Sequence, residues 1–480
     1  MLKLRTSSWR IPKMLIRRLL SRLSLVSETR RRRFSKKKDD LPNEVVVNME
    51  EEEEANEIPS EAVVKMQVEE EEAKEMYLAL LPREVVVEIL LRLPVKSLVR
   101  FRCVCKDWCS LISSNTFIAT HNHTNRHDNN NSGLLLFRYA KTILIDTVIS
   151  REFENFSLRT DGGSFGNNNN FIQLNCPLKP PASCPCYSFT NIVGSWNGLL
   201  CFAYTDHYQR NYYCYNLWNP SIHRALSLPE PNFTLSLHAI FNHSHGFGYD
   251  PSTNDIKLIR LVYLRGRDYK VKVPPLVEIY TLNTGSWRAI AAPAPSYIVN
   301  ERCLSVFVNG ASHWVAHTPP EEGTFRNMIV AFDMVDEVFH EIAVPDHFVG
   351  KLYLNMTVAV LDGLLCLVPF NERKEEQSFS IWIMKEYGIG ESWTKLFNIH
   401  ISQGLKRVVA FRKNGEVLVT DRKGELLSYE PHIKRVTQLG FLPLPEELET
   451  GTMYWESSFY LDKYVESLVL LNAKNGVSGR

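Results

Sequence analysis

The chain of 480 residues lacks several features that mark particular classes of protein. Its first 38 residues hold no apolar run long enough for a membrane span or a signal peptide, because Arg17, Arg18 and Arg22 interrupt it. Its ten cysteines are scattered and do not form the disulfide framework of a small secreted domain. Its formal net charge is only +1, which gives no general case for nucleic-acid binding. We therefore expect a reducing compartment, no membrane span and no nucleic-acid partner.

The sequence also has no P-loop, no HExxH motif and no dinucleotide-binding fingerprint. Residues 162–166 fit the G-x-S-x-G pattern of hydrolases, but four asparagines follow where a helix is needed. Cys105 and Cys109, with His123 and His127, approach a zinc-finger spacing. The two cysteines are expected on one packed side of a helix, which predicts buried thiols, and the histidines are expected in a polar loop. We expect no catalytic site, no metal and no cofactor.

The small net charge conceals opposite charges at the front of the chain. Residues 1–38 are rich in arginine and lysine with Glu28 as the only acid, whereas residues 39–75 carry two runs of glutamate. This charge density opposes burial, so we expect residues 1–75 to be a disordered extension. The basic part alternatively suits nuclear import, polyanion binding or organelle targeting, and Met76 offers an alternative start. We expect the protein in the nucleus, the cytoplasm or both.

The stretch from Leu81 to Ile112 predicts three short helices. Apolar residues at spacings of three and four place one stripe on the first helix: Val85, Val86, Ile89, Leu90 and Leu93. Pro94 ends that helix because it cannot donate to the helical hydrogen bonds. The second helix is expected over residues 95–102 and the third over residues 105–113. So small a unit cannot bury all this apolar surface by itself, and the surplus is expected to face a partner.

The same stretch resembles the F-box motif in its plant form. The resemblance rests on Leu81-Pro82, Glu84, Ile89-Leu90, Leu93-Pro94, Leu98, Arg100-Phe101, Val104-Cys105-Lys106 and Trp108. It implies docking to the Skp-type adaptor of a cullin–RING ubiquitin ligase. The residues expected to contact the adaptor, or to build the helices that present it, are Leu81, Pro82, Ile89, Leu90, Leu93, Pro94, Leu98, Val104, Cys105 and Trp108.

From residue 133 onward the pattern changes to strands separated by turns. An Asn-Gly or Asp-Gly turn before an apolar strand recurs at Gly198, Gly310, Gly363 and Gly415, and the last three glycines are 53 and 52 residues apart. A period near fifty with several strands per unit is typical of a propeller blade. We expect about six blades, closed by pairing of residues 468–471 with an early strand near residues 133–145.

Residues 191–440 resemble the plant F-box-associated interaction domain through GSWNGLLCF, YNLWNPS, HGFGYDPSTNDIKLIRL and VNGASHWVA. The period is kelch-like, but the consecutive glycines of kelch repeats are absent. Tryptophans recur about once per repeat and are expected to pack between blades: Trp196, Trp218, Trp287, Trp314 and Trp393.

The predicted fold is therefore multi-domain α plus β. It comprises the extension at 1–75, the three-helix F-box at 76–122, a linker at 123–132 and an all-β, propeller-like domain at 133–475. The resemblance implies a non-catalytic substrate-recognition subunit of an SCF-type ubiquitin ligase. Such a subunit binds a Skp-type adaptor, through it the cullin and RING subunits, and a target protein on the propeller. An adaptor-independent interaction scaffold is the alternative.

Overall fold

The computed structural model describes residues 82–127, 133–145, 149–161, 171–178, 188–206, 213–234, 240–266, 271–290, 294, 296–299, 305–319, 326–350, 355–370, 378–401, 405–421, 425–439, 453–470 and 477–478. The predicted extension, the G-x-S-x-G segment and Leu81 lie outside these residues. The chain divides into two compact units, residues 1–117 and residues 118–480. In the part of the chain that the structure describes, no helix is both long and apolar enough to cross a membrane.

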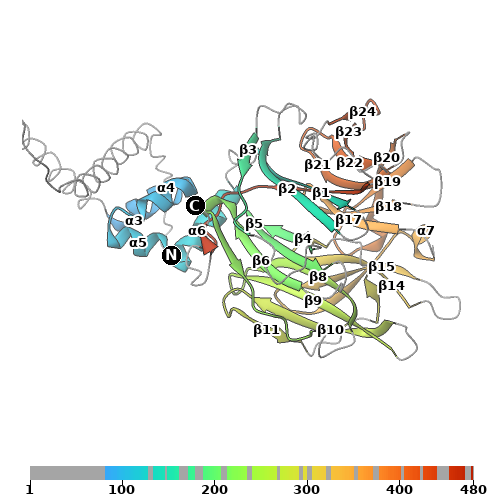
Figure 1. Ribbon diagram of the computed structural model, residues 1–480, viewed down its shortest axis with the longest axis horizontal. Helices are drawn as coiled ribbons and strands as arrows, with labels where there is room; N and C mark the ends of the chain where they lie inside the picture. Colours follow the sequence, from blue (N-terminus) through green and yellow to red (C-terminus); the bar gives the residue numbers. More distant parts are fainter. Residues whose placement is uncertain are drawn as a thin grey trace, which may run out of the picture. The chain divides into compact units, whose positions relative to one another are not determined.

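The first unit contains three short helices at the predicted places (Figure 1). They are α3 (Arg83–Leu91), α4 (Val95–Phe101) and α5 (Lys106–Ile112). Pro82 and Pro94 directly precede α3 and α4, and each proline carbonyl accepts hydrogen bonds from the first turn of its helix. Pro82 thus lies at the N-cap of α3, just outside the helix. Proline is tolerated at both positions, because the residue before a helix makes no helical hydrogen bond through its N–H group.

A fourth helix, α6 (Asn115–His127), follows directly. Ser114 Oγ accepts the N–H of Phe117 at 3.2 Å, which is the bond of a serine N-cap. Phe117 and His121, four residues apart on one side of the helix, are both buried. The sequence predicted a loop at His123 and His127 and a linker over 123–132. Both predictions were therefore wrong for the residues up to 127. The polar composition suggested a loop, whereas burial of one helix face decides the structure here.

The second unit consists of six antiparallel sheets that follow one another around a ring, as the propeller prediction requires (Figure 1). We number them as blades. Blade 1 contains β25 (Met453–Lys463), β1 (Leu134–Ile145), β2 (Ile149–Thr160) and β3 (Phe171–Leu174). Blade 2 contains β4 (Ser188–Trp196), β5 (Leu199–Asp206), β6 (Tyr213–Asn219) and β7 (Arg224–Ser227), with β26 (Val477–Ser478) at its edge. Blade 3 contains β8 (Ile240–Asp250), β9 (Asp255–Arg265), β10 (Val271–Thr281) and β11 (Ser286–Ala289).

The remaining three blades follow the same order. Blade 4 contains β12 (Ile298–Val299), β13 (Val306–Val308), β14 (Ala311–His317), β15 (Asn327–Asp333) and β16 (Phe339–Ala343). A short helix, α7 (Asp346–Val349), leads to blade 5, which contains β17 (Asn355–Leu361), β18 (Leu364–Phe370), β19 (Ser378–Met384) and β20 (Trp393–His400). Blade 6 contains β21 (Leu405–Phe411), β22 (Val417–Asp421), β23 (Leu426–Glu430) and β24 (Arg435–Gln438).

The ring is closed by a strand from the end of the chain, but not by the predicted one. Strand β25 pairs antiparallel with β1, from Leu135 opposite Lys463 to Ile145 opposite Met453. Residues 468–471 form no strand over their described part. Instead, the carbonyls of Ser467 and Val469 accept hydrogen bonds from Asn219 Nδ2 at 3.0 and 2.8 Å. Joining the first and last strands in one sheet removes two exposed sheet edges.

The predicted Asn-Gly and Asp-Gly turns connect β4 to β5, β13 to β14, β17 to β18 and β21 to β22. Both turn residues have positive φ at Asn197-Gly198, Asn309-Gly310 and Asp362-Gly363. This is the type I′ geometry of a two-residue hairpin, whose twist matches that of the strands it joins. At the fourth turn only Gly415 has a positive φ. The repeat predicted from the sequence is thus confirmed as a repeated hairpin.

Two of these glycines allow a matched test of ring closure. A Cβ at Gly198 would lie 2.0 Å from the carbonyl oxygen of Val465, whereas one at Gly363 would meet nothing within 4 Å. Gly363→Ala is expected to cost only the strain of a left-handed residue, about 1–2 kcal/mol. Gly198→Ala adds displacement of the segment that follows β25, so its loss should be clearly larger. Urea unfolding of both variants measures the difference, and equal losses would contradict this packing.

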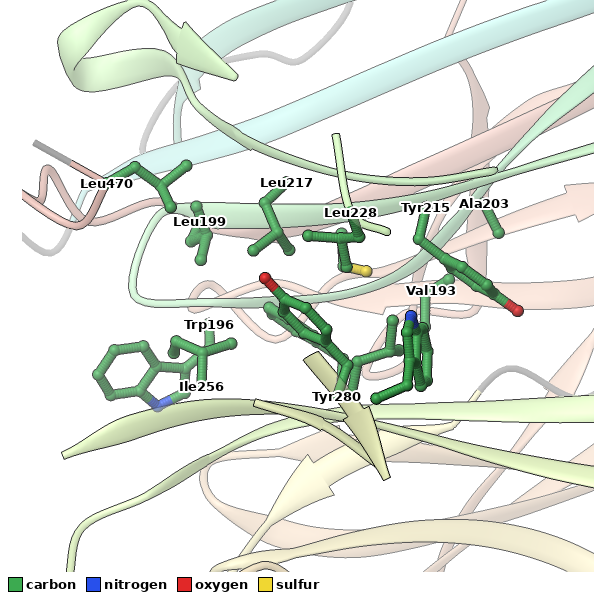
Figure 2. Packing of buried hydrophobic residues seen from close by; sticks show 14 residues of the cluster. Val193, Trp196, Leu199, Ala203, Tyr215, Leu217, Leu228, Ile256, Tyr280 and Leu470 are labelled. Carbon is green, nitrogen blue, oxygen red and sulfur yellow. The ribbon is translucent and has the colours of Figure 1, made fainter. Parts of the chain in front are cut away.

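All five tryptophans predicted to pack between blades are buried at such contacts. The indole N–H of Trp314 in blade 4 donates to the carbonyl of His245 in blade 3 at 2.7 Å. The other four contacts join Trp393 to Ala343, Trp287 to Tyr215, Trp196 to Tyr249 and Trp218 to Phe156. Figure 2 shows the core between blades 2 and 3, where Leu199 and Leu217 face Ile256 and Tyr280.

Buried ion pairs also join neighbouring blades. Lys257 Nζ in blade 3 lies 2.8 Å from Asp250 and 2.9 Å from Glu337 of blade 4. Burial alone would raise the pKa of Asp250, but hydrogen bonds from Lys257, Ser252 and Thr253 outweigh it and lower this pKa. The same two carboxylates raise the pKa of Lys257 against the opposing effect of burial. The lysine therefore stays charged and ties the two blades together.

Candidate adaptor-binding surface

The predicted adaptor residues fall into two groups in the first unit. Leu90, Leu93 and Leu98 are buried and hold the helices together. The other six described residues keep part of their surface exposed: Pro82, Pro94 and Cys105 are exposed, and Ile89, Val104 and Trp108 are half-buried. We call these six residues the adaptor face. Apolar side chains left outside a completed core are the usual anchors of a protein interface.

Trp108 is the largest side chain of the adaptor face. It lies on α5, and its ring centroid is 5.5 Å from that of Phe101 on α4, with an angle of 56° between the rings. Phe101 is buried, whereas Trp108 keeps a part of its indole exposed. Trp108 therefore has one side packed on the helices and another available to a partner, as an interface aromatic requires.

Cys105 differs from its predicted role. Its backbone is extended, with φ −150° and ψ 167°, and it is the N-cap of α5 rather than a residue inside that helix. Its sulfur accepts the N–H of Trp108 at 3.4 Å, and the thiol is exposed. The prediction of a buried thiol was therefore wrong at this position. The helix begins one residue later than predicted, so Cys105 lies at its exposed end, whereas Cys109 within the helix is half-buried.

A polar contact joins the ends of the second and third helices. Arg102 at the end of α4 donates from Nε to Ser113 Oγ, just after α5, at 3.0 Å. On the outer side of α3, Glu88 and Arg92 form an exposed ion pair one turn apart, a type of pair that contributes little to stability. The arginine contact thus holds the helix carrying Trp108 against α4.

The sequence-based list of adaptor residues missed part of the half-buried apolar surface. Val85 and Val86 on α3, Val99 on α4 and Leu111 on α5 are all half-buried. The helical spacing of Val85 and Val86 was visible in the sequence and was the signal that could have included them. Among the described residues, no group of three or more His, Cys, Asp or Glu side chains is placed to hold a metal ion.

Comparison with known families agrees with this division of the chain. Residues 78–120 match the F-box domain, and residues 147–471 match the F-box associated beta propeller domain. The Arabidopsis thaliana F-box protein At3g07870 is 26% identical over 418 residues, which cover 78% of this chain and 92% of the relative. The F-box/kelch-repeat protein At3g23880 of the same plant is 29% identical over 351 residues, covering 69% and 85%. Its F-box protein CPR1 is 26% identical over 422 residues, covering 82% and 89%.

The chain therefore belongs to the F-box proteins that carry an F-box associated beta propeller domain. This pair of domains, together with the F-box relatives, supports a general role as an SCF substrate adaptor. Such a combination is typical of non-catalytic substrate receptors.

Proposed function

We propose that this chain is the substrate-recognition subunit of an SCF-type E3 ubiquitin ligase. The F-box docks a Skp-type adaptor, and through it the cullin and RING subunits, while the propeller binds a target protein. The chain performs no covalent step itself. It raises the effective concentration of target lysines near a ubiquitin-loaded enzyme, which is catalysis by proximity.

The observation that carries the proposal is the exposure of the adaptor face. The buried leucines complete the core of a small unit without it, yet Pro82, Pro94, Cys105 and part of Trp108 still reach the surface. An isolated apolar surface of this kind is unfavourable in water, and a partner that covers it gains the corresponding free energy.

The test is reconstitution with purified components. The full chain is mixed with a Skp-type adaptor, a cullin and a RING subunit and analysed by size-exclusion chromatography. The proposal expects one complex of all four proteins, formed only when the adaptor is present. A chain that elutes alone, with the adaptor in excess, would leave the adaptor-independent scaffold as the better description.

A further inference from the structure

Five exposed apolar side chains of the propeller lie at the same end of two neighbouring blades. Each blade has antiparallel strands, so the connections from its first to second and third to fourth strands lie at the same end. Nine large apolar side chains are clearly exposed among the described residues. Five of them lie in blades 4 and 5, either in a connection at this end or at the end of a strand beside one. These five are Val335, Val338, Val360, Tyr387 and Ile389, each 37–49% exposed. We call them the turn patch.

The two blades meet at this patch. Tyr387, in the connection from β19 to β20 of blade 5, has its hydroxyl 2.7 Å from His313 Nε2 on β14 of blade 4. A Cβ at Gly390 in the same connection would lie 3.0 Å from the Cβ of Ala343 on β16. Burial lowers the pKa of His313 to about 4, so this histidine is neutral near pH 7 and only holds the tyrosine in place. The blade 5 connection therefore lies against blade 4.

The unpaired charges around the turn patch are mostly negative. Glu337 is neutralised by its ion pairs with Lys257 and Arg288. Four exposed carboxylates in the same connections have no ion-pair partner among the described residues: Asp336, Asp362, Glu386 and Glu391. Lys385 is the single basic side chain in these connections, 333–338, 361–363 and 384–392. The patch is thus apolar with an acidic border.

The corresponding connection of blade 6 provides a contrast. Ile433 between β23 and β24 is 58% exposed, but its neighbours are His432, Lys434 and Arg435. Exposed apolar surface thus occurs at this end of blade 6 as well, but there its described neighbours are basic rather than acidic. Turns normally carry polar residues, so apolar side chains at two adjacent turns indicate a binding surface.

We propose that the turn patch binds the target protein through a segment that combines lysine or arginine with apolar side chains, as on one side of a basic amphipathic helix. The occupant follows from charge complementarity, since the acidic border would repel an acidic or phosphorylated segment. The inference rests on the proposed function, because it identifies which part of the propeller receives the substrate and the chemistry it selects.

The experiment uses the full chain and two synthetic probes of 20 residues, one with leucine and lysine at helical spacing and one with glutamate replacing each lysine. Fluorescence polarisation should show binding of the lysine probe only, weakening as salt is raised. Asp336→Lys combined with Glu386→Lys should weaken it about tenfold or more, and Ile389→Ser should also weaken it. The matched controls Glu230→Lys and Ile433→Ser, both at exposed sites outside the patch, should leave it unchanged.

Three outcomes would overturn the inference. They are equal binding of the two probes, no effect of the patch variants, and tighter probe binding when Arg17, Arg18 and Arg22 are replaced by glutamate. The last would show that the chain's own basic segment occupies the patch. Adaptor capture is measured with the same proteins. Lost probe binding with intact adaptor capture refutes only this inference, whereas probe binding without adaptor capture refutes the proposed function.

Discussion

Trp108→Ala is expected to abolish capture of a Skp-type adaptor by the full chain. The indole packs on Phe101 from one side and is exposed on another, so its removal takes away an interface anchor and loosens the contact between α4 and α5. A loss on the order of 3–5 kcal/mol, more than a hundredfold in affinity, follows for such a side chain. Pull-down of the purified adaptor measures it, and undiminished capture would refute the assignment of this surface.

A control has to separate lost contact from lost folding. Leu396→Ala removes an exposed apolar side chain on β20 of the propeller and should leave capture unchanged. Val104→Glu places a charge on the adaptor face at a half-buried site without removing a core residue. It should also prevent capture, because an unpaired charge would have to be desolvated on docking. Near-UV circular dichroism of both F-box variants should still show the folded propeller.

Glu278→Leu is expected to produce the largest loss of stability in the propeller. Glu278 on β10 lies directly opposite Arg260 on β9, with Oε1 2.6 Å from Arg260 Nη1, and both side chains are buried. Its other oxygen accepts the N–H groups of Asn232 and Phe233 at 3.0 and 3.4 Å, which holds the connection between blades 2 and 3. Removing it leaves a buried arginine charge, at a cost of about 3–5 kcal/mol.

The double variant Arg260→Met with Glu278→Leu separates two contributions to the loss of stability, the buried charge and the lost backbone contacts. It removes the buried arginine charge, but it leaves two N–H groups without their acceptor and the carbonyl of Phe233 without its donor Arg260, so about 1–3 kcal/mol of the loss should remain. The matched control is Arg435→Met in blade 6, where Arg435 lies opposite Glu430 at 2.8 Å in an exposed pair. That change should cost less than about 1 kcal/mol in urea unfolding. Equal losses for Glu278→Leu and Arg435→Met would contradict a dominant role of burial.

The local features of the F-box were predictable because they depend on short-range rules. Pro94 separates the first two helices, and spacings of three and four residues place the apolar stripe, so all three helices appear where the sequence predicts them. The exposure of Cys105 was not predictable in the same way. A shift of one residue in the start of α5 changes a helical position into an N-cap, and element ends are the least certain part of any such prediction.

The propeller repeat was predictable for a similar reason. Asn-Gly and Asp-Gly pairs at a period near fifty specify type I′ turns through the backbone freedom of their residues, and three of the four have this geometry. The closing strand was misplaced because residues 468–471 and β25 both contain apolar side chains. Choosing between them depends on pairing with β1, more than 300 residues away along the chain.

The sequence by itself determined the three F-box helices and the repeated hairpins, because each of these follows from interactions between residues close in the chain. The class of the protein was indicated by the resemblance of its motifs to a known family. Only the tertiary structure decided which F-box residues stay exposed, which strand closes the ring and where acidic and apolar turns of two blades meet. Those features depend on contacts between distant segments, and no local pattern encodes the distance between Tyr387 and His313.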